Sequence, residues 1–227
     1  MRRPAVTPVP LLSPRHFLAG GLFFGWAGVI PCCLATSVAF DETIFPPVIG
    51  RAISDTERSV REAEGHEMLQ AACRGYTNLG VLYASLDPPR SIATCLRGLE
   101  AAKKVGDLGF QSRLYANLAV AYCALTSRCE AEGIEAAHAA ATLDRRLGLL
   151  DHLAVPLIVL GQIHQCHGDH ARAYESYEEA LQLAERIGEP QLLFPCYDGL
   201  ATLHLDAGRT AQAEAFLAKA QAVCERA

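Results

Sequence analysis

The chain has 227 residues and a formal net charge of −5, so it lacks the basic footprint expected of a nucleic-acid-binding protein. Its length would suit one or two globular domains, but the repeats described below favour one continuous array without a single central core. Ala, Leu and Glu are abundant and strand-type alternation is absent, which predicts an all-α protein.

The N-terminal part of the chain is apolar and rich in proline. Residues 1–16 contain four prolines, which remove backbone donors and clash with a helical interior, so we expect a flexible leader there. Residues 17–40 contain no Asp, Glu, Lys or Arg over 24 positions, and that length is enough to cross a bilayer. Arginines precede this stretch, acidic residues follow it, and residues 37–39 would serve as a signal-peptide cleavage site.

Three interpretations of the apolar segment, residues 17–49, stay open. Pro31 and four glycines argue against a membrane role, and the flanking charges would place the repeats outside the cytoplasm. Seven cysteines follow in residues 50–227, and an odd number without a framework favours reduced thiols in the cytosol. We therefore predict a cytoplasmic protein with a degenerate buried helix here, and keep a signal peptide and a membrane anchor as alternatives.

Helical periodicity begins at Gly50. Residues 50–65 match the second helix of a helical hairpin, with Ala52, Val60 and Ala63 near one face. The residues Phe45-Pro46-Pro47 interrupt the register upstream, so we predict half a repeat at this end.

Four helical hairpins follow, at residues 72–106, 111–148, 153–188 and 193–227. They share large, small and aromatic positions in register, which are Tyr76, Leu79, Gly80 and Tyr83; Tyr115, Leu118, Ala119 and Tyr122; Leu157, Leu160, Gly161 and His164; and Tyr197, Leu200, Ala201 and His204.

The third hairpin has the clearest pattern, because Gly168-Asp169 separates two amphipathic stretches. Gly161, Ala173 and Ala180 are small, and two helices approach to about 8 Å only where the side chains at their crossing are small. One hairpin cannot bury its apolar faces alone, so the repeats must stack.

These spacings resemble the tetratricopeptide repeat. The anchors Tyr76, Tyr115, Leu157 and Tyr197 are 39, 42 and 40 residues apart, longer than the usual ~34. The surplus falls at three junctions, GDLGFQSR, GLLDHLAV and GEPQLLFP. The resemblance is to the longer-helix subtype found in the C-terminal arrays of bacterial nucleotide cyclases and regulatory ATPases. It implies a right-handed α-α superhelix of about four to five hairpins that acts in interaction and not in catalysis.

In the family that the spacing resembles, the first helix of each hairpin lines the concave surface. Arg74 and Asn78 lie four residues apart, and Arg113 and Asn117 repeat them 39 residues later. Arginine can fork onto a carboxylate, and asparagine can bridge a donor and an acceptor of an extended peptide. The pairs resemble part of the clamp that some tetratricopeptide proteins use on acidic peptide tails.

The third and fourth copies depart from this clamp, because they carry Val155 and Val159, then Pro195 and Gly199. A set of neutral and acidic residues would extend the same surface, namely Gln162, Gln165, Asp198, Thr202 and Asp206. The alternative is that all these residues belong to solvated helix faces, with the asparagines bonding neighbouring helices.

No metal, cofactor or catalytic site is predicted. His164, Cys166, His167 and His170 carry metal-ligating groups, but His164 falls at a packing position of the repeat and the spacing matches no closed site. The chain has no glycine-rich phosphate loop, HExxH, CxxC or G-x-S-x-G motif. The acidic pairs Glu178-Glu179 and Glu130 with Glu132 are interpreted as surface carboxylates.

The sequence therefore predicts a non-catalytic scaffold that binds a partner peptide or helix in its concave groove. One alternative is a regulatory or oligomerising fragment of a larger bacterial signalling protein. Another is an exported or membrane-tethered scaffold. The last predicted helix has no polar cap after it, which terminal repeats normally need, so the edge around Leu217, Ala220 and Cys224 is a candidate surface for a second copy or a partner.

Overall fold

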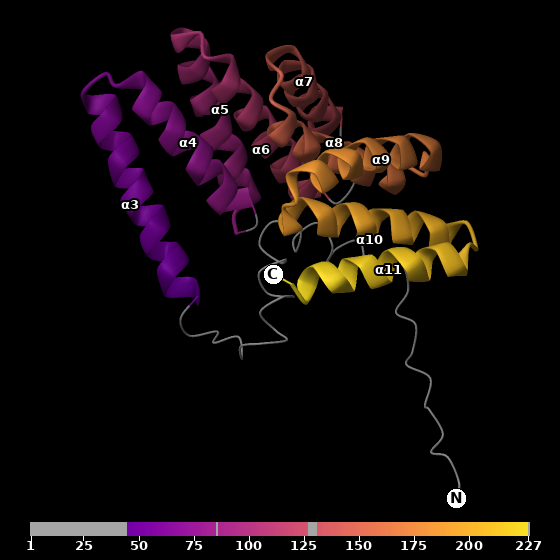
Figure 1. Cartoon of the computed structure of the whole chain (residues 1–227). Coiled ribbons are helices and arrows are strands. Elements are labelled where there is room, and N and C mark those ends of the chain that lie inside the picture. The colour runs from indigo at the N-terminus through magenta and orange to yellow at the C-terminus, as the bar shows by residue number, and fades with distance from the viewer. Residues whose placement is uncertain (1–44, 85, 127–130, 227) are drawn as a thin grey trace, which may run out of the picture.

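The computed structural model describes residues 45–84, 86–126 and 131–226, and α-helices are the only regular secondary structure in them. Nine helices follow one another along these residues (Figure 1): α3 Phe45–Gly65, α4 Leu69–Ala84, α5 Pro88–Val105, α6 Leu108–Thr126, α7 Ala131–Leu147, α8 Leu150–Cys166, α9 His170–Ile187, α10 Pro190–Asp206 and α11 Thr210–Cys224. The predicted leader and most of the apolar segment, with the interpretations attached to residues 17–40, lie outside this part of the chain. None of the described helices is long and apolar enough to cross a membrane.

The helices pack as a solenoid of hairpins. Helix α4 pairs with α5, α6 with α7, α8 with α9 and α10 with α11, while α3 packs on α4. The first helices α4, α6, α8 and α10 each contact the next first helix, whereas consecutive second helices make no such contact within the described residues. The row of first helices is therefore the closely spaced, concave side of the array. The helix axes turn along the chain, from α3 at one end to α11 at the other (Figure 1).

Helix α3 begins earlier than the periodicity predicted. It starts at Phe45, so residues 45–49 belong to this helix and not to the apolar segment. Pro46 and Pro47 occupy its first turn, where backbone N–H groups have no intrahelical acceptor. Proline has no N–H group, so no helical hydrogen bond is lost at these two positions. The two prolines begin the helix and do not interrupt it.

The breaks between helices have clear local causes. Asp87 and Asp169 cap α5 and α9, because their side chains accept hydrogen bonds from the backbone N–H of the residue three positions on, at 3.1 and 3.2 Å. Gly106 and Gly188 end the same helices with φ values of 74° and 79°, a left-handed conformation that glycine adopts without a Cβ clash. The predicted break at Gly168-Asp169 is confirmed.

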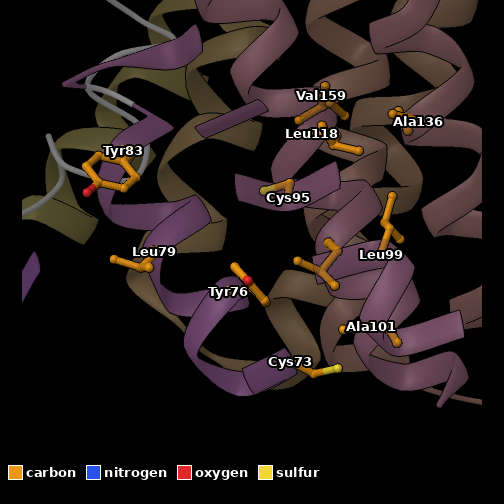
Figure 2. Close-up of a cluster of buried hydrophobic side chains, with 14 of the residues drawn as sticks. Cys73, Tyr76, Leu79, Tyr83, Cys95, Leu99, Ala101, Leu118, Ala136 and Val159 are labelled. Carbon is orange, nitrogen blue, oxygen red and sulfur yellow. The ribbon is translucent and has the colours of Figure 1, made fainter. Parts of the chain in front are cut away.

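The apolar core runs through the array. Buried side chains from α3 to α8 form one cluster, and a second cluster joins α7 to α10. Figure 2 shows part of the first, with Tyr76, Leu79 and Tyr83 along α4 and with Leu118 and Val159 from the next two first helices. Helix α8 contributes to both clusters, so each hairpin is buried by its neighbours, as a stacked repeat requires.

The closest helix approach is built around one tyrosine. The ring of Tyr177 on α9 lies against Gly161 of α8 and Gly199 of α10, where an added Cβ would come within 2.8 and 2.3 Å of ring atoms. Its hydroxyl donates a hydrogen bond to Gln165 Oε1 at 3.2 Å. We call Tyr177, Gly161, Gly199 and Gln165 the tyrosine seam. It confirms that the small residue Gly161 permits the crossing.

The C-terminal edge differs from the prediction. Leu217 is 44% exposed, but Ala220 and Cys224 are buried at 4% and 8%. Ala220 packs with Val223 and Tyr197 in a small cluster. Only Leu217 of the three predicted edge residues is an exposed apolar side chain, because the inner face of α11 is covered by α10.

The described cysteines form no disulfide. They are Cys73, Cys95, Cys123, Cys166, Cys196 and Cys224; Cys129 lies outside the described residues. Burial raises the pKa of the Cys95 and Cys196 thiols to about 12, so both stay protonated at neutral pH. These two thiols therefore act as small apolar packing groups.

Candidate functional site

A cavity opens on the row of first helices. Its volume is about 290 Å³, close to the lower end of the range of about 300–1,000 Å³ for ligand pockets. Helices α4, α6 and α7 contribute Thr77, Val81, Arg113, Ala116, Asn117 and Asp144. Helices α8 and α10, with the residue before α10, contribute Asp151, His152, Val155, Glu189, Gln191 and Leu192. All four first helices therefore meet at this one site.

More than half of the lining residues come from the three junctions that lengthen the repeat. Arg113 ends the first junction, Asp151, His152 and Val155 lie in the second, and Glu189, Gln191 and Leu192 lie in the third. The residues by which the period exceeds ~34 thus form much of the wall of the cavity.

Asp144 is the buried acid of the cavity, with an exposed fraction of 1%. Its Oδ1 accepts a hydrogen bond from Ser112 Oγ at 2.5 Å, and the fully buried Ser112 is also 3.2 Å from the carbonyl oxygen of Ala140. Its Oδ2 has no hydrogen-bond partner. Burial raises the pKa of Asp144, against the opposing effects of Ser112, His152 and Arg113, because removing a carboxylate from water disfavours its charged form.

Arg113 and His152 form a pair at the same site. The Nε of Arg113 donates to Nδ1 of His152 at 3.3 Å, and its Nη2 lies 3.4 Å from the other ring nitrogen. Burial and the neighbouring guanidinium lower the pKa of His152, so the imidazole is neutral at pH 7 and can accept from arginine. Both contacts are near the long end of hydrogen-bond distances, and the Arg113 side chain is exposed.

Asn117 has a structural bond. Its Nδ2 donates to the carbonyl oxygen of Thr77 at 2.9 Å and so ties α6 to α4. This is the bond between neighbouring helices that the alternative interpretation of the asparagines expected. Asn117 lines the cavity, but one of its amide donors is already used.

Two prolines interrupt the hydrogen bonding of the first helices beside the cavity. Pro156 lies inside α8 and Pro195 inside α10. Proline has no N–H, so the usual bond to the carbonyl four residues earlier is not made. Those carbonyls belong to His152 and Gln191, and both residues line the cavity.

The structure brings together only part of the predicted site. Arg113 and Asn117 line the cavity, whereas the exposed Arg74 and Asn78 do not. Among the other predicted residues, Gln165 belongs to the tyrosine seam, Thr202 donates to the backbone oxygen of Asp198 at 3.0 Å, and Gln162 and Asp206 lie outside the cavity lining. Burial raises the pKa of Asp198, which also lies outside the cavity.

Sequence reasoning missed the acids and the histidine of the cavity. Asp144 lies on a second helix, whereas the resemblance to the repeat family points to the first helices. A signal was present, because Ala137, Ala140 and Asp144 recur at helical spacing on one buried face of α7, and a charged residue is rarely fully buried unless it is paired. Asp151, His152 and Glu189 lie at helix starts, where polar residues are common and do not by themselves indicate a binding site.

The histidine and cysteine group of the third hairpin lies at the turn between α8 and α9. His164 and Cys166 are partly buried, while His167 and His170 are exposed. Within the part of the chain that the structure describes, no cluster of three or more His, Cys, Asp or Glu is arranged to hold a metal ion. Glu179 pairs with Arg145 at 2.7 Å, and Glu130 lies outside the described residues.

Two of three comparisons with known proteins found a similarity. The tetratricopeptide-repeat family matches residues 152–226, and no curated protein matches the chain. The crystal structure of BtubC (BKLC) from P. vanneervenii is similar over 91% of this chain and 90% of that one, with a TM-score of 0.59 and 19% identity. At that identity the similarity shows the fold alone. The family match covers α8 to α11, and the hairpins before them repeat the same packing.

Proposed function

We propose that the array is a non-catalytic scaffold that binds a segment of a partner protein on its concave face, at the cavity around Asp144. Tetratricopeptide domains generally bind protein partners and are typically non-catalytic. The observation that carries the proposal is that all four first helices, α4, α6, α8 and α10, contribute to one cavity of about 290 Å³. A partner segment seated there would contact the whole length of the row.

The lining suits a peptide. Val81, Ala116, Val155 and Leu192 offer apolar surface, and Arg113 and Gln191 offer polar groups at the exposed edge. A mixed wall of this kind fixes the orientation of a ligand through a few polar contacts, while apolar burial supplies affinity. The predicted Arg74 and Asn78 would extend the surface along α4, beyond the cavity.

The experiment is a selection of peptides from a displayed random library on the full chain, followed by affinity measurement with labelled peptides. Val155→Arg places a long cation in the cavity and is expected to weaken the selected peptides at least tenfold. Arg113→Ala is expected to change their affinity several-fold, whereas the matched change Arg74→Ala, at an exposed arginine outside the cavity, should have a smaller effect. Equal affinity for Val155→Arg and the unchanged protein would refute groove binding.

A second candidate is self-association through the last helix, which is the oligomerising alternative. It is favoured by Leu217, an exposed apolar side chain of α11. Leu217→Arg would then shift the chain to monomer in sedimentation velocity while Val155→Arg would not. A monomer at all concentrations would exclude this candidate.

We place the scaffold in the cytoplasm, as the described cysteines form no disulfide and reducing compartments keep thiols in that state. Export or membrane attachment through residues 17–40 is the alternative. Fractionation of the native host, with the terminal peptide identified by mass spectrometry, distinguishes the two. A terminus at Phe40, or recovery with membranes, would overturn the cytoplasmic assignment.

A further inference from the structure

We propose that the cavity takes the side chain of a lysine from the partner, with the ammonium group held by Asp144. This inference rests on the proposed function and names the chemistry that the concave site recognises. It also reverses the expectation of an acidic peptide, which the arginine and asparagine pairs of the sequence had favoured.

The first support is the unpartnered oxygen of Asp144. Within the described residues only two buried side-chain atoms lack a hydrogen-bond partner, Asp144 Oδ2 and His204 Nδ1. The ring of His204 lies between Tyr174 and Phe216, at centroid distances of 6.0 and 5.4 Å, and does not line the cavity, so it is a packing group. Asp144 does line the cavity, and buried carboxylates are normally paired.

The second support is charge. The lining contains three acids, Asp144, Asp151 and Glu189, and one arginine, Arg113. With all four ionised and His152 neutral, the negative charges exceed the positive one by two. A carboxylate ligand would be repelled by three acids, whereas a cation is attracted.

The number of free acceptors favours lysine over arginine. Ser112 already donates to Oδ1 of Asp144, whereas Oδ2 has no partner, so a guanidinium that made two parallel bonds would have to share Oδ1 with Ser112. An ammonium is a point charge with three donors. Oδ2 of Asp144 can take one. His152 and Gln191, whose backbone carbonyls lack their usual helical donors because of Pro156 and Pro195, also line the cavity.

The shape of the lining suits the stem of the same side chain. Val81, Ala116, Val155 and Leu192 can cover the four methylenes of lysine, which pack on apolar surface while the charged end finds polar partners. Oδ2 is buried, so a neighbouring side chain must turn for the ammonium to reach it. We expect Arg113 to turn outward, because it is exposed and its two contacts with His152 are long.

The test uses the full chain and three small probes of similar length: n-pentylammonium, 1-pentanol and pentanoate. Binding is followed by NMR shifts of backbone amides in a titration at pH 7. We expect saturable shifts at Val155 and Leu192 with pentylammonium, at least tenfold weaker binding of pentanol, and no binding of pentanoate. Pentanol binding as well as the amine would overturn the proposal, as would preferential binding of pentanoate.

A matched pair of variants assigns the effect to one carboxylate. Asp144→Asn should lower the affinity for pentylammonium at least tenfold, whereas Asp55→Asn, at an exposed acid of α3 outside the cavity, should leave it unchanged. Unchanged affinity in folded Asp144→Asn would contradict the proposal. If that variant does not fold, the comparison of the three probes on the unchanged chain decides the question.

The peptide library separates this inference from the proposed function. Peptides that share a lysine and lose affinity in Val155→Arg support both. Peptides without lysine that still depend on Val155 would overturn the inference and leave the groove as the binding site. Selection of no peptide would refute both.

Discussion

The tyrosine seam and the cavity around Asp144 are built from adjacent parts of the array but differ in how completely they are filled. In the seam, Gly161 and Gly199 leave no room beside the ring of Tyr177, and the hydroxyl of that tyrosine has Gln165 as a partner. In the cavity, about 290 Å³ stays open and one oxygen of a buried carboxylate has no partner.

The difference indicates which part of the array a ligand would stabilise. A fully packed and satisfied junction fixes the angle between hairpins, and any added atom there costs stability. An open junction with an unpartnered acid loses stability in the free protein, and a ligand that supplies a donor recovers it. The same array therefore provides a packed joint in one place and, under the proposed function, a binding position in the next.

The largest expected effect is at the seam. A methyl group at Gly199 would lie 2.3 Å from Cζ of Tyr177, far inside the ~3.5–4.0 Å of an ordinary carbon contact. The ring has little room to move away, because Gly161 lies against it as well. We expect Gly199→Ala to lower the free energy of unfolding by about 1–3 kcal/mol, measured by urea denaturation.

Gly50→Ala is the matched control for this change. Gly50 lies in α3 with no atom within 4 Å of an added Cβ, so alanine should raise stability by up to ~1 kcal/mol through helix propensity alone. If both substitutions had the same effect, the close approach at Tyr177 would not be a determinant of stability.

The fold could be predicted from the sequence to a large extent, because small and large apolar residues recur at the positions where the helices pack. Gly161, Ala173 and Ala180 indicate a close crossing, and all three are buried where α8 meets α9. The start of α3 could not be predicted, since Pro46 and Pro47 suit both a break and a first turn.

The site was less predictable, because it depends on how junctions from different repeats meet. Arg113 and Asn117 were found because Arg74 and Asn78 stand at the same positions one repeat earlier. Asp144, His152 and Glu189 were not found through any such repetition. The bond from Asn117 to the carbonyl of Thr77 also shows that a repeated polar residue can serve helix packing. Repetition reports what every hairpin needs, whereas a ligand site depends on what one hairpin has alone.

The second prediction concerns the cavity and has the opposite sign. Burial raises the pKa of folded Asp144 above its ordinary value of 3.8, so the folded state binds this proton more tightly than the unfolded chain does. The stabilising contribution is present at low pH and is lost as the pH rises from 3.8 through the raised pKa. Asp144→Asn removes this titration.

We therefore expect Asp144→Asn to be more stable than the unchanged protein at pH 7, by about 0.5–2 kcal/mol, with a difference that shrinks as the pH falls toward 3.8. Urea denaturation of both proteins across pH 3.5–7 measures it. A variant that is less stable at pH 7 would show that the folded protein satisfies the charge of Asp144 in full.

A smaller effect is expected for the polar end of the seam. Tyr177→Phe removes the hydroxyl bond to Gln165 and leaves the ring against both glycines, so it should cost at most about 1 kcal/mol. A cost as large as that of Gly199→Ala, in the same urea experiment, would mean that hydrogen bonding and not ring packing dominates the seam.

The smallest effect is expected for Arg145, the residue after Asp144, which pairs with Glu179 of α9. Arg145 Nη2 contacts both carboxylate oxygens of Glu179 at 2.7 and 2.8 Å, and the two side chains are 49% and 45% exposed. Such a pair contributes about 0.2–1 kcal/mol, so Arg145→Ala should lower the free energy of unfolding by no more than that amount. The loss should be smaller in 1 M NaCl, because the Debye length falls to about 3 Å and salt screens the pair. The affinity for pentylammonium should change less than twofold, because Arg145 is not part of the cavity lining. A tenfold change would mean that the two faces of α7 are coupled, and that the cavity is not an independent binding position beside the packed joint.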